Sequence, residues 1–138
     1  MIKYTFQRIN DESFIIVEAS IEGYPVRLAL DTAATHTVID LNILLLLGYS
    51  ENSKIATTTI ETATGLVEVG QYAVKKFDAL QKVEEPFHIL SFDFLAKGFP
   101  CAYDGILGLN FFSQTVLTID FTKQELWLMQ EDMREGFG

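Results

Sequence analysis

The sequence has few of the residues that cross-link small domains through disulfides or metal ions. It contains one cysteine, Cys101, which excludes an internal disulfide, and we expect this residue to be a small buried side chain. Its two histidines, His36 and His88, lie far apart in the chain, and with a single cysteine they do not make the ligand pattern of a zinc site. We therefore predict no bound metal.

Positive charge is also scarce. The chain has 10 lysines and arginines against 19 aspartates and glutamates, for a net charge of -9 at pH 7, and no run of five basic residues occurs. Phosphate groups are bound by clustered lysine and arginine. This balance argues against nucleic acid and anionic membrane as partners, and it predicts a solvated acidic surface.

Long apolar runs are absent as well. The longest, Ile43–Leu47, is far shorter than the roughly 20 residues that cross a bilayer. Residues 1–6 lack the pattern of a signal peptide. We expect a soluble, cytoplasmic protein, and a domain cut from a longer chain is an open alternative.

The sequence does contain enough apolar material for a core. Its 138 residues are 49% hydrophobic, which predicts a single domain over residues 1–138. Short segments rich in β-branched and aromatic residues alternate with turn residues. They predict strands at residues 14–21, 26–30, 37–39, 55–60, 66–74, 87–94, 116–121 and 125–129.

One or two short helices interrupt the predicted strands. Asp40 is placed to cap a helix over residues 41–47, and Gly48 is placed to end it. A second short helix is expected around Asn110, with that side chain capping the helix or bonding within it, and residues 96–102 predict a loop. Many short strands with few helices are typical of all-β folds, and we predict a closed β-barrel.

One aspartate stands in a distinctive setting. Apolar residues 28–30 predict a strand that ends at Asp31, small residues follow, and a second apolar segment begins at Thr37. An isolated Asp-Thr pair commonly closes a turn, with the aspartate side chain bonded to the backbone. The same setting also presents a carboxylate on a turn, where it can act as an acid or a base.

Two segments, in order along the chain, resemble those of the retropepsin-like aspartic peptidases. Asp31–Ile39 (DTAATHTVI) is similar to the family's Asp-Thr/Ser-Gly-Ala motif. Gly105–Phe112 is similar to the family's element of two apolar residues and a glycine, with a short helix behind it. A turn at Thr62–Gly65 lies between them, where the family's flap tip would be. The resemblance covers residues 14–128, and it implies a barrel of the acid-protease type.

The resemblance implies an aspartic endopeptidase assembled from two identical chains. Peptide hydrolysis in this family uses two carboxylates that share one proton, one serving as base and the other as acid. This chain carries the motif once, so Asp31 from each of two subunits would form the pair at a two-fold axis. The implied partners are a second copy of the chain and a peptide or protein substrate, with no cofactor.

The resemblance also implies roles for the neighbours of Asp31. Thr32 would hydrogen-bond across the interface, and Ala33 would belong to the supporting loop. Substrate would contact residues of the cleft and the flap tip, namely Ala34, Thr35, His36, Ala63, Thr64 and Gly65. Ile106 and Leu107 would brace the loop from behind, and Gly108 would let two chain segments cross closely.

One residue departs from the family pattern, because Ala33 stands where the family usually has glycine. A positive φ at this position would strain an alanine by about 1 kcal/mol. A methyl group facing the dyad would displace the catalytic water. A second hypothesis is therefore a catalytically silent module of the same fold that binds peptides or dimerises. A third is a structural β-module in which Asp31 only closes a turn.

Overall fold

The chain folds mostly into β-strands. The structure is a computed structural model that describes residues 1–8, 13–63, 65–94 and 103–130. Its strands are β1 (Ile2–Thr5), β2 (Ile16–Ile21), β3 (Tyr24–Leu30), β4 (Val38–Asp40), β5 (Ala56–Thr62), β6 (Gly65–Val74), β7 (Phe77–Ala79), β8 (Lys82–Glu84), β9 (Phe87–Phe92), β10 (Gly105–Leu107), β11 (Thr115–Asp120) and β12 (Glu125–Gln130). Its helical elements are the α-helix α1 (Leu41–Leu46) and the 3-10 helices η1 (Glu51–Ser53) and η2 (Leu109–Phe112). Within these ranges, no helix is long and apolar enough to cross a membrane.

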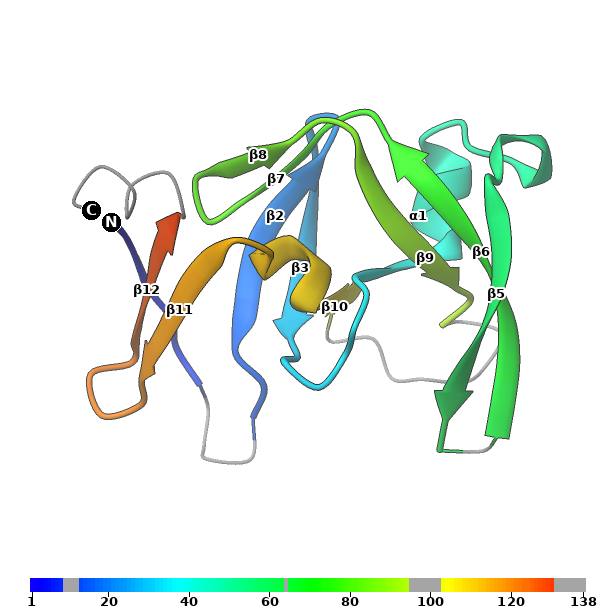
Figure 1. Ribbon diagram of the computed structural model, residues 1–138. Coiled ribbons are helices and arrows are strands. Elements are labelled where there is room, and N and C mark those ends of the chain that lie inside the picture. The colour runs from blue at the N-terminus through cyan, green and yellow to red at the C-terminus, as the bar shows by residue number, and fades with distance from the viewer. Residues whose placement is uncertain (9–12, 64, 95–102, 131–138) are drawn as a thin grey trace.

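The strands form two sheets (Figure 1). A three-stranded antiparallel sheet has the order β1-β12-β11, and a nine-stranded sheet has the order β5-β6-β9-β4-β10-β3-β2-β7-β8. In Figure 1 the small sheet lies at one side of the molecule and the β5–β6 hairpin at the other. The loop between β3 and β4, residues 31–37, lies between them, below the end of β3 in this view. We call it the Asp31 loop.

The predicted closed barrel is wrong. Closing a sheet requires its two edge strands to pair, but the large sheet ends at β5 and β8, and the small sheet ends at β1 and β11. Across the described residues both sheets are therefore open. A pattern of short strands between turns reads the same for open and closed sheets, because it reports the strands and not which edges meet.

The predicted strands and the first helix are present with shifted ends. The α1 helix is capped as predicted, since Asp40 Oδ1 accepts from Asn42 N at 3.2 Å, and Gly48 follows the helix with a φ of 97°. Strands β1, β7, β8 and β10 are absent from the sequence prediction, because three or four residues show too little alternation. The predicted loop at 96–102, with Cys101, lies outside the described residues.

A crossing of chain segments forms the centre of the large sheet. Strand β10 lies between β3 and β4, parallel to β3 and antiparallel to β4. Leu107 is opposite Leu30, and Ile106 is opposite Val38. Because β3 and β4 flank the Asp31 loop in the sequence, β10 holds both ends of this loop from a distant part of the chain.

Aromatic side chains anchor that crossing to the main core. Phe77 and Phe87 stack with ring centroids 4.7 Å apart, and Phe111 meets them edge-on at 5.5 and 6.0 Å. Phe111 belongs to η2, which follows β10 directly, so its packing fixes the segment behind the Asp31 loop. A second apolar cluster joins β4, β6 and β9, and it contains Val38, Val69, Leu90, Phe92 and Phe94.

Phe111→Ala should lower the free energy of unfolding by about 3–5 kcal/mol, because it opens a cavity where three aromatic rings meet. Phe121→Ala is the matched control, since Phe121 is 55% exposed and its loss should cost less than about 1 kcal/mol. Urea denaturation followed by circular dichroism measures both variants. Equal losses would contradict the anchoring role of Phe111.

Candidate active site

Asp31 stands at the entrance to its loop, directly after β3. Its backbone N–H donates to Leu107 O of β10 at 3.1 Å, and its side-chain Oδ1 accepts from Ala33 N at 2.9 Å. Its backbone carbonyl accepts from Ala34 N at 3.1 Å. The half-buried carboxylate is thus oriented by its own turn, and its second oxygen accepts no hydrogen bond from the part of the chain that the structure describes.

Behind the loop, Asn110 forms the centre of a polar network. Its Oδ1 accepts from both Thr37 N and Thr37 Oγ1 at 2.8 Å, and its Nδ2 donates to His88 O at 2.8 Å. Thr37 Oγ1 in turn accepts from Gly108 N at 3.1 Å. Thr37 is 0% exposed, so this network satisfies groups that water does not reach. The expectation that Asn110 caps its own short helix or bonds within it is wrong, because its partners lie on the Asp31 loop and on β9.

Gly108 lies against the backbone of the Asp31 loop. A Cβ added there would lie 2.4 Å from His36 O and 3.0 Å from Ala34 O. Leu109 N also donates to Ala34 O at 2.8 Å. Both close contacts are with backbone atoms, which cannot rotate away, so a side chain at position 108 would push the loop out of place.

A groove of about 640 Å³ opens beside Asp31. The Asp31 loop and strand β5 both contribute to its lining, together with three apolar side chains and Gln71 of β6. Its lining residues are Asp31, Ala33, Ala34, Thr35, His36, Val38, Thr58, Thr59, Ile60, Glu61, Gln71, Leu90 and Ile106. The groove therefore places a carboxylate next to an apolar surface and an edge strand, a combination that suits an extended peptide.

The structure gathers most of the predicted loop residues at this groove. Of the residues predicted to surround the site, those that line it are Asp31, Ala33, Ala34, Thr35, His36 and Ile106. Thr32, Ala63 and Gly65 are exposed and do not line it, whereas Leu107 and Gly108 are buried behind the loop. Thr64 lies outside the described residues.

Sequence reasoning missed the contribution of β5 to the groove. Residues Thr58–Glu61 line it, yet a threonine-rich strand carries no chemical motif. Their only signal is position, because the strand leads into the turn that resembles a flap tip. On the loop side, Thr35 Oγ1 and His36 Nδ1 lie 3.0 Å apart and share a hydrogen bond. The ionisable residues of the lining are Asp31, His36 and Glu61.

Ala33 does not have the positive φ angle that would strain an alanine in this turn. Among the described residues other than glycine, those with a positive φ are Glu22, Leu80, Gln81, Gln114 and Gln124. Ala33 is exposed and its methyl group is part of the groove lining. The effect of this alanine therefore falls on what enters the groove or faces it, and not on the loop conformation.

The sequence model of the family described as aspartyl protease matches residues 17–111, which include the Asp31 loop, the β5–β6 hairpin and β10. The chain belongs to the aspartyl protease family. This match spans more than half of the chain, and it confirms the resemblance that the Asp31–Ile39 and Gly105–Phe112 segments carry. A comparison with curated proteins finds no matching sequence.

The fold of this family member is retropepsin-like. It is similar to the crystal structure of a retropepsin-like aspartic protease from Rickettsia conorii, with a TM-score of 0.68 over 92% of this chain and 98% of that chain. The two sequences are 16% identical. At this identity the likeness shows the fold, and the chemistry of this chain must be argued from its own residues.

Asn110→Ala should lower the free energy of unfolding by roughly 1–3 kcal/mol, because it leaves the buried Thr37 N–H without its acceptor. Hydrogen exchange at the Thr37 amide should also accelerate. Asn110→Asp is the matched control, since a carboxylate still accepts from Thr37 while the bond to His88 O is lost. Equally slow Thr37 exchange in the two variants would show that the loop does not depend on this network.

Proposed function

We propose that the protein is an aspartic endopeptidase whose catalytic pair consists of Asp31 from each of two identical chains. The position of Asp31 carries the proposal. Its carboxylate is oriented by the bond from Ala33 N, its backbone is held by Leu107, and it lines a groove shaped by loop and hairpin. Membership of the aspartyl protease family supports the same chemistry. One chain supplies one motif carboxylate, so the site is complete only in a homodimer.

The proposed reaction is hydrolysis by two carboxylates without a covalent intermediate. The two Asp31 side chains share one proton, because carboxylates a few Å apart cannot both ionise. The ionised one takes a proton from a water molecule, whose oxygen bonds to the peptide carbonyl carbon. The protonated one supplies the proton that the peptide nitrogen carries away when the C–N bond breaks. No metal or cofactor takes part.

The substrate in this proposal is a peptide segment in extended form. Strand β5 is an edge of the large sheet, and edge strands pair with extended peptides through main-chain groups. Ala34, Thr35 and His36 contact the peptide from the loop side. The hairpin tip, residues 63–65, closes over it from the other side. Thr32, exposed beside Asp31, hydrogen-bonds between the two loops of the dimer.

A second candidate function is a catalytically silent module that binds peptides. One observation favours it, since the methyl group of Ala33 lies in the groove lining where the family usually has glycine. A group of this size next to the dyad competes with the attacking water for space. Misplacing the reacting atoms by about 1 Å costs on the order of a hundredfold in rate.

Asp31→Asn should abolish peptide cleavage, because an amide can neither take nor give the shared proton. Incubation of a mixed peptide library with each purified chain from about pH 4 to about pH 7 measures this. The wild-type rate should fall as the pH rises toward neutral, since the pair needs one proton to act as the acid. Undiminished cleavage by the Asp31→Asn chain would sink the proposal.

Ala33→Gly separates the active enzyme from the silent module. If the methyl group obstructs the catalytic water, its removal should raise kcat by about tenfold or more. The unfolding midpoint should fall slightly, because Ala33 has no strain to relieve and glycine loses more backbone entropy on folding. A tolerated alanine gives rates within about twofold of each other. Initial-rate kinetics on one cleaved library peptide decide between them, and the double variant with Asp31→Asn serves as the inactive control.

A further inference from the structure

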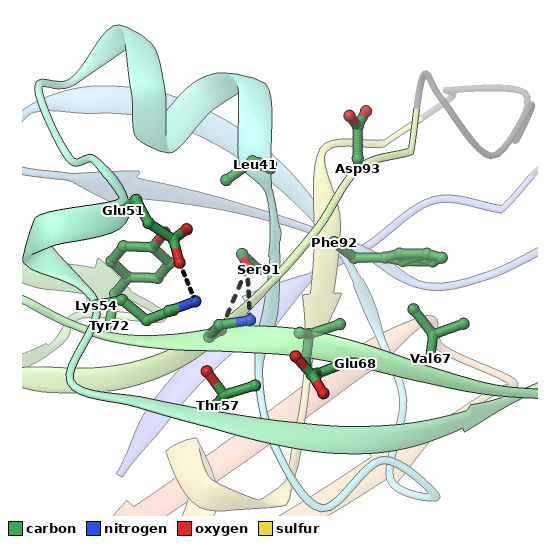
Figure 2. A pocket seen from close by; sticks show the side chains of 12 residues that line it. Leu41, Glu51, Lys54, Thr57, Val67, Glu68, Tyr72, Ser91, Phe92 and Asp93 are labelled. Carbon is green, nitrogen blue, oxygen red and sulfur yellow. Dashed lines mark hydrogen bonds and ion pairs between the residues drawn. The ribbon is translucent and has the colours of Figure 1, made fainter.

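A second pocket lies behind the β5–β6 hairpin (Figure 2). It has a volume of about 290 Å³ and is lined by residues from α1, η1, β5, β6 and β9. On β9, Leu90 lines the groove and Ser91 lines this pocket, and on β6 the same holds for Gln71 and Gly70. Successive side chains of a strand point to opposite faces. The pocket is therefore on the far side of the sheet from the groove, at the root of the hairpin.

The pairing between strand β6 and strand β9 ends at this root. Residues Gln71–Val74 pair with β9, whereas Gly65–Gly70 pair with β5 alone. Gly70 is thus the point beyond which the hairpin has no third strand. Ser91, which is 6% exposed, grips this point, because its Oγ accepts from Gly70 N and donates to Gly70 O, both at 3.2 Å. The dashed lines from Ser91 in Figure 2 mark these two bonds.

Lys54 covers the same point from the side of the pocket. A Cβ on Gly70 would lie 2.6 Å from Lys54 Cδ and 3.2 Å from Lys54 Cγ, so the aliphatic chain lies directly on the glycine. Its ammonium pairs with Glu51 of η1, as Figure 2 shows. The hydrogen bond with Glu51 raises the pKa of Lys54, which keeps the ammonium charged. The strand is therefore held between a serine and a lysine.

Strand β9 connects this hold to the Asp31 loop. Ser91 is opposite Ile39 in the parallel pairing of β4 and β9. Its neighbour Leu90 donates its backbone N–H to Thr37 O at 2.9 Å. Ser91 thus lies between the hairpin root and the strand that follows the Asp31 loop.

We propose that Ser91 and Lys54 form a latch at Gly70, which fixes the root of the β5–β6 hairpin while the rest of the hairpin bends over the groove. Ser91 is a positioning residue, because it touches the hairpin backbone and not the groove. The latch sets the position of β5 relative to the Asp31 loop on the other side of the groove. Its effect on cleavage rests on the proposed function, whereas its effect on the hairpin does not.

Ser91→Ala in the full chain tests the latch directly. Hydrogen exchange of the amides in residues 66–70 should become about tenfold faster, because the bonds that tie Gly70 to β9 are lost. Exchange in the β2–β3 hairpin should stay unchanged. Ser113→Ala, at an exposed serine after η2, is the matched control and should alter neither region. Exchange at 66–70 equal to that of the control, or equally faster in both hairpins, would overturn the proposal.

A double-mutant cycle tests the lysine. Gly70→Ala places a methyl group in the path of Lys54, so exchange at 66–69 should rise about fivefold or more. In a Lys54→Ala chain the 2.6 Å clash is gone and the close neighbour that is left is Tyr72 Cε2 at 3.2 Å, so Gly70→Ala should then change this exchange by less than about twofold. The same increase in both backgrounds would show that Lys54 does not hold Gly70.

Kinetics connect the latch to the proposed peptidase. Ser91→Ala should raise KM by roughly three- to tenfold and change kcat by less than about twofold, since a loosened hairpin must be ordered by the substrate while the dyad is intact. A fall in kcat at constant KM would contradict the positioning role. A wild-type chain that cleaves no peptide would overturn the proposed function alone, because the exchange measurements would still decide on the latch.

Discussion

The close crossing of main chain at Gly108 is the constraint on which the rest of the structure depends. A Cβ at this position would collide with carbonyl oxygens of the Asp31 loop, so only glycine lets the segments meet. The crossing inserts β10 between β3 and β4 and supplies Leu107 O as the acceptor for Asp31 N–H. Asn110 then ties the far end of the loop from behind. The proposed reaction requires the Asp31 carboxylate to be held to within about 1 Å, and a distant segment fixes the loop that carries it.

The open edge of the large sheet has a consequence for the site. Strand β5 is an edge strand, and the β5–β6 hairpin extends beyond β9, because β9 pairs with β6 over Gln71–Val74. The hairpin lines the groove that Asp31 also lines. At the base of the hairpin, Gly70, Ser91 and Lys54 meet where the third strand ends. The β5–β6 hairpin thus contributes to the lining of both the groove and the pocket behind it.

The sequence predicted those features whose cause is local. Strand periodicity, the Asp40 cap and the turn at Asp31 all depend on residues within a few positions of one another, and the structure contains them. The closed barrel was wrong, because which edges meet depends on pairings that no local pattern encodes. The role of Asn110 was missed for the same reason, since its partners Thr37 and His88 are 73 and 22 residues away. The lining by β5 carried no signal beyond its place before a flap-like turn.

A mixture of active and inactive chains measures whether two chains share one catalytic pair. Wild-type and Asp31→Asn chains are combined at a fixed total concentration, allowed to exchange partners, and assayed for cleavage of one peptide. A shared pair predicts activity proportional to the square of the wild-type fraction, so an equal mixture retains about a quarter of the activity. An equal mixture that retains about half would mean that each chain acts alone, and it would contradict the account.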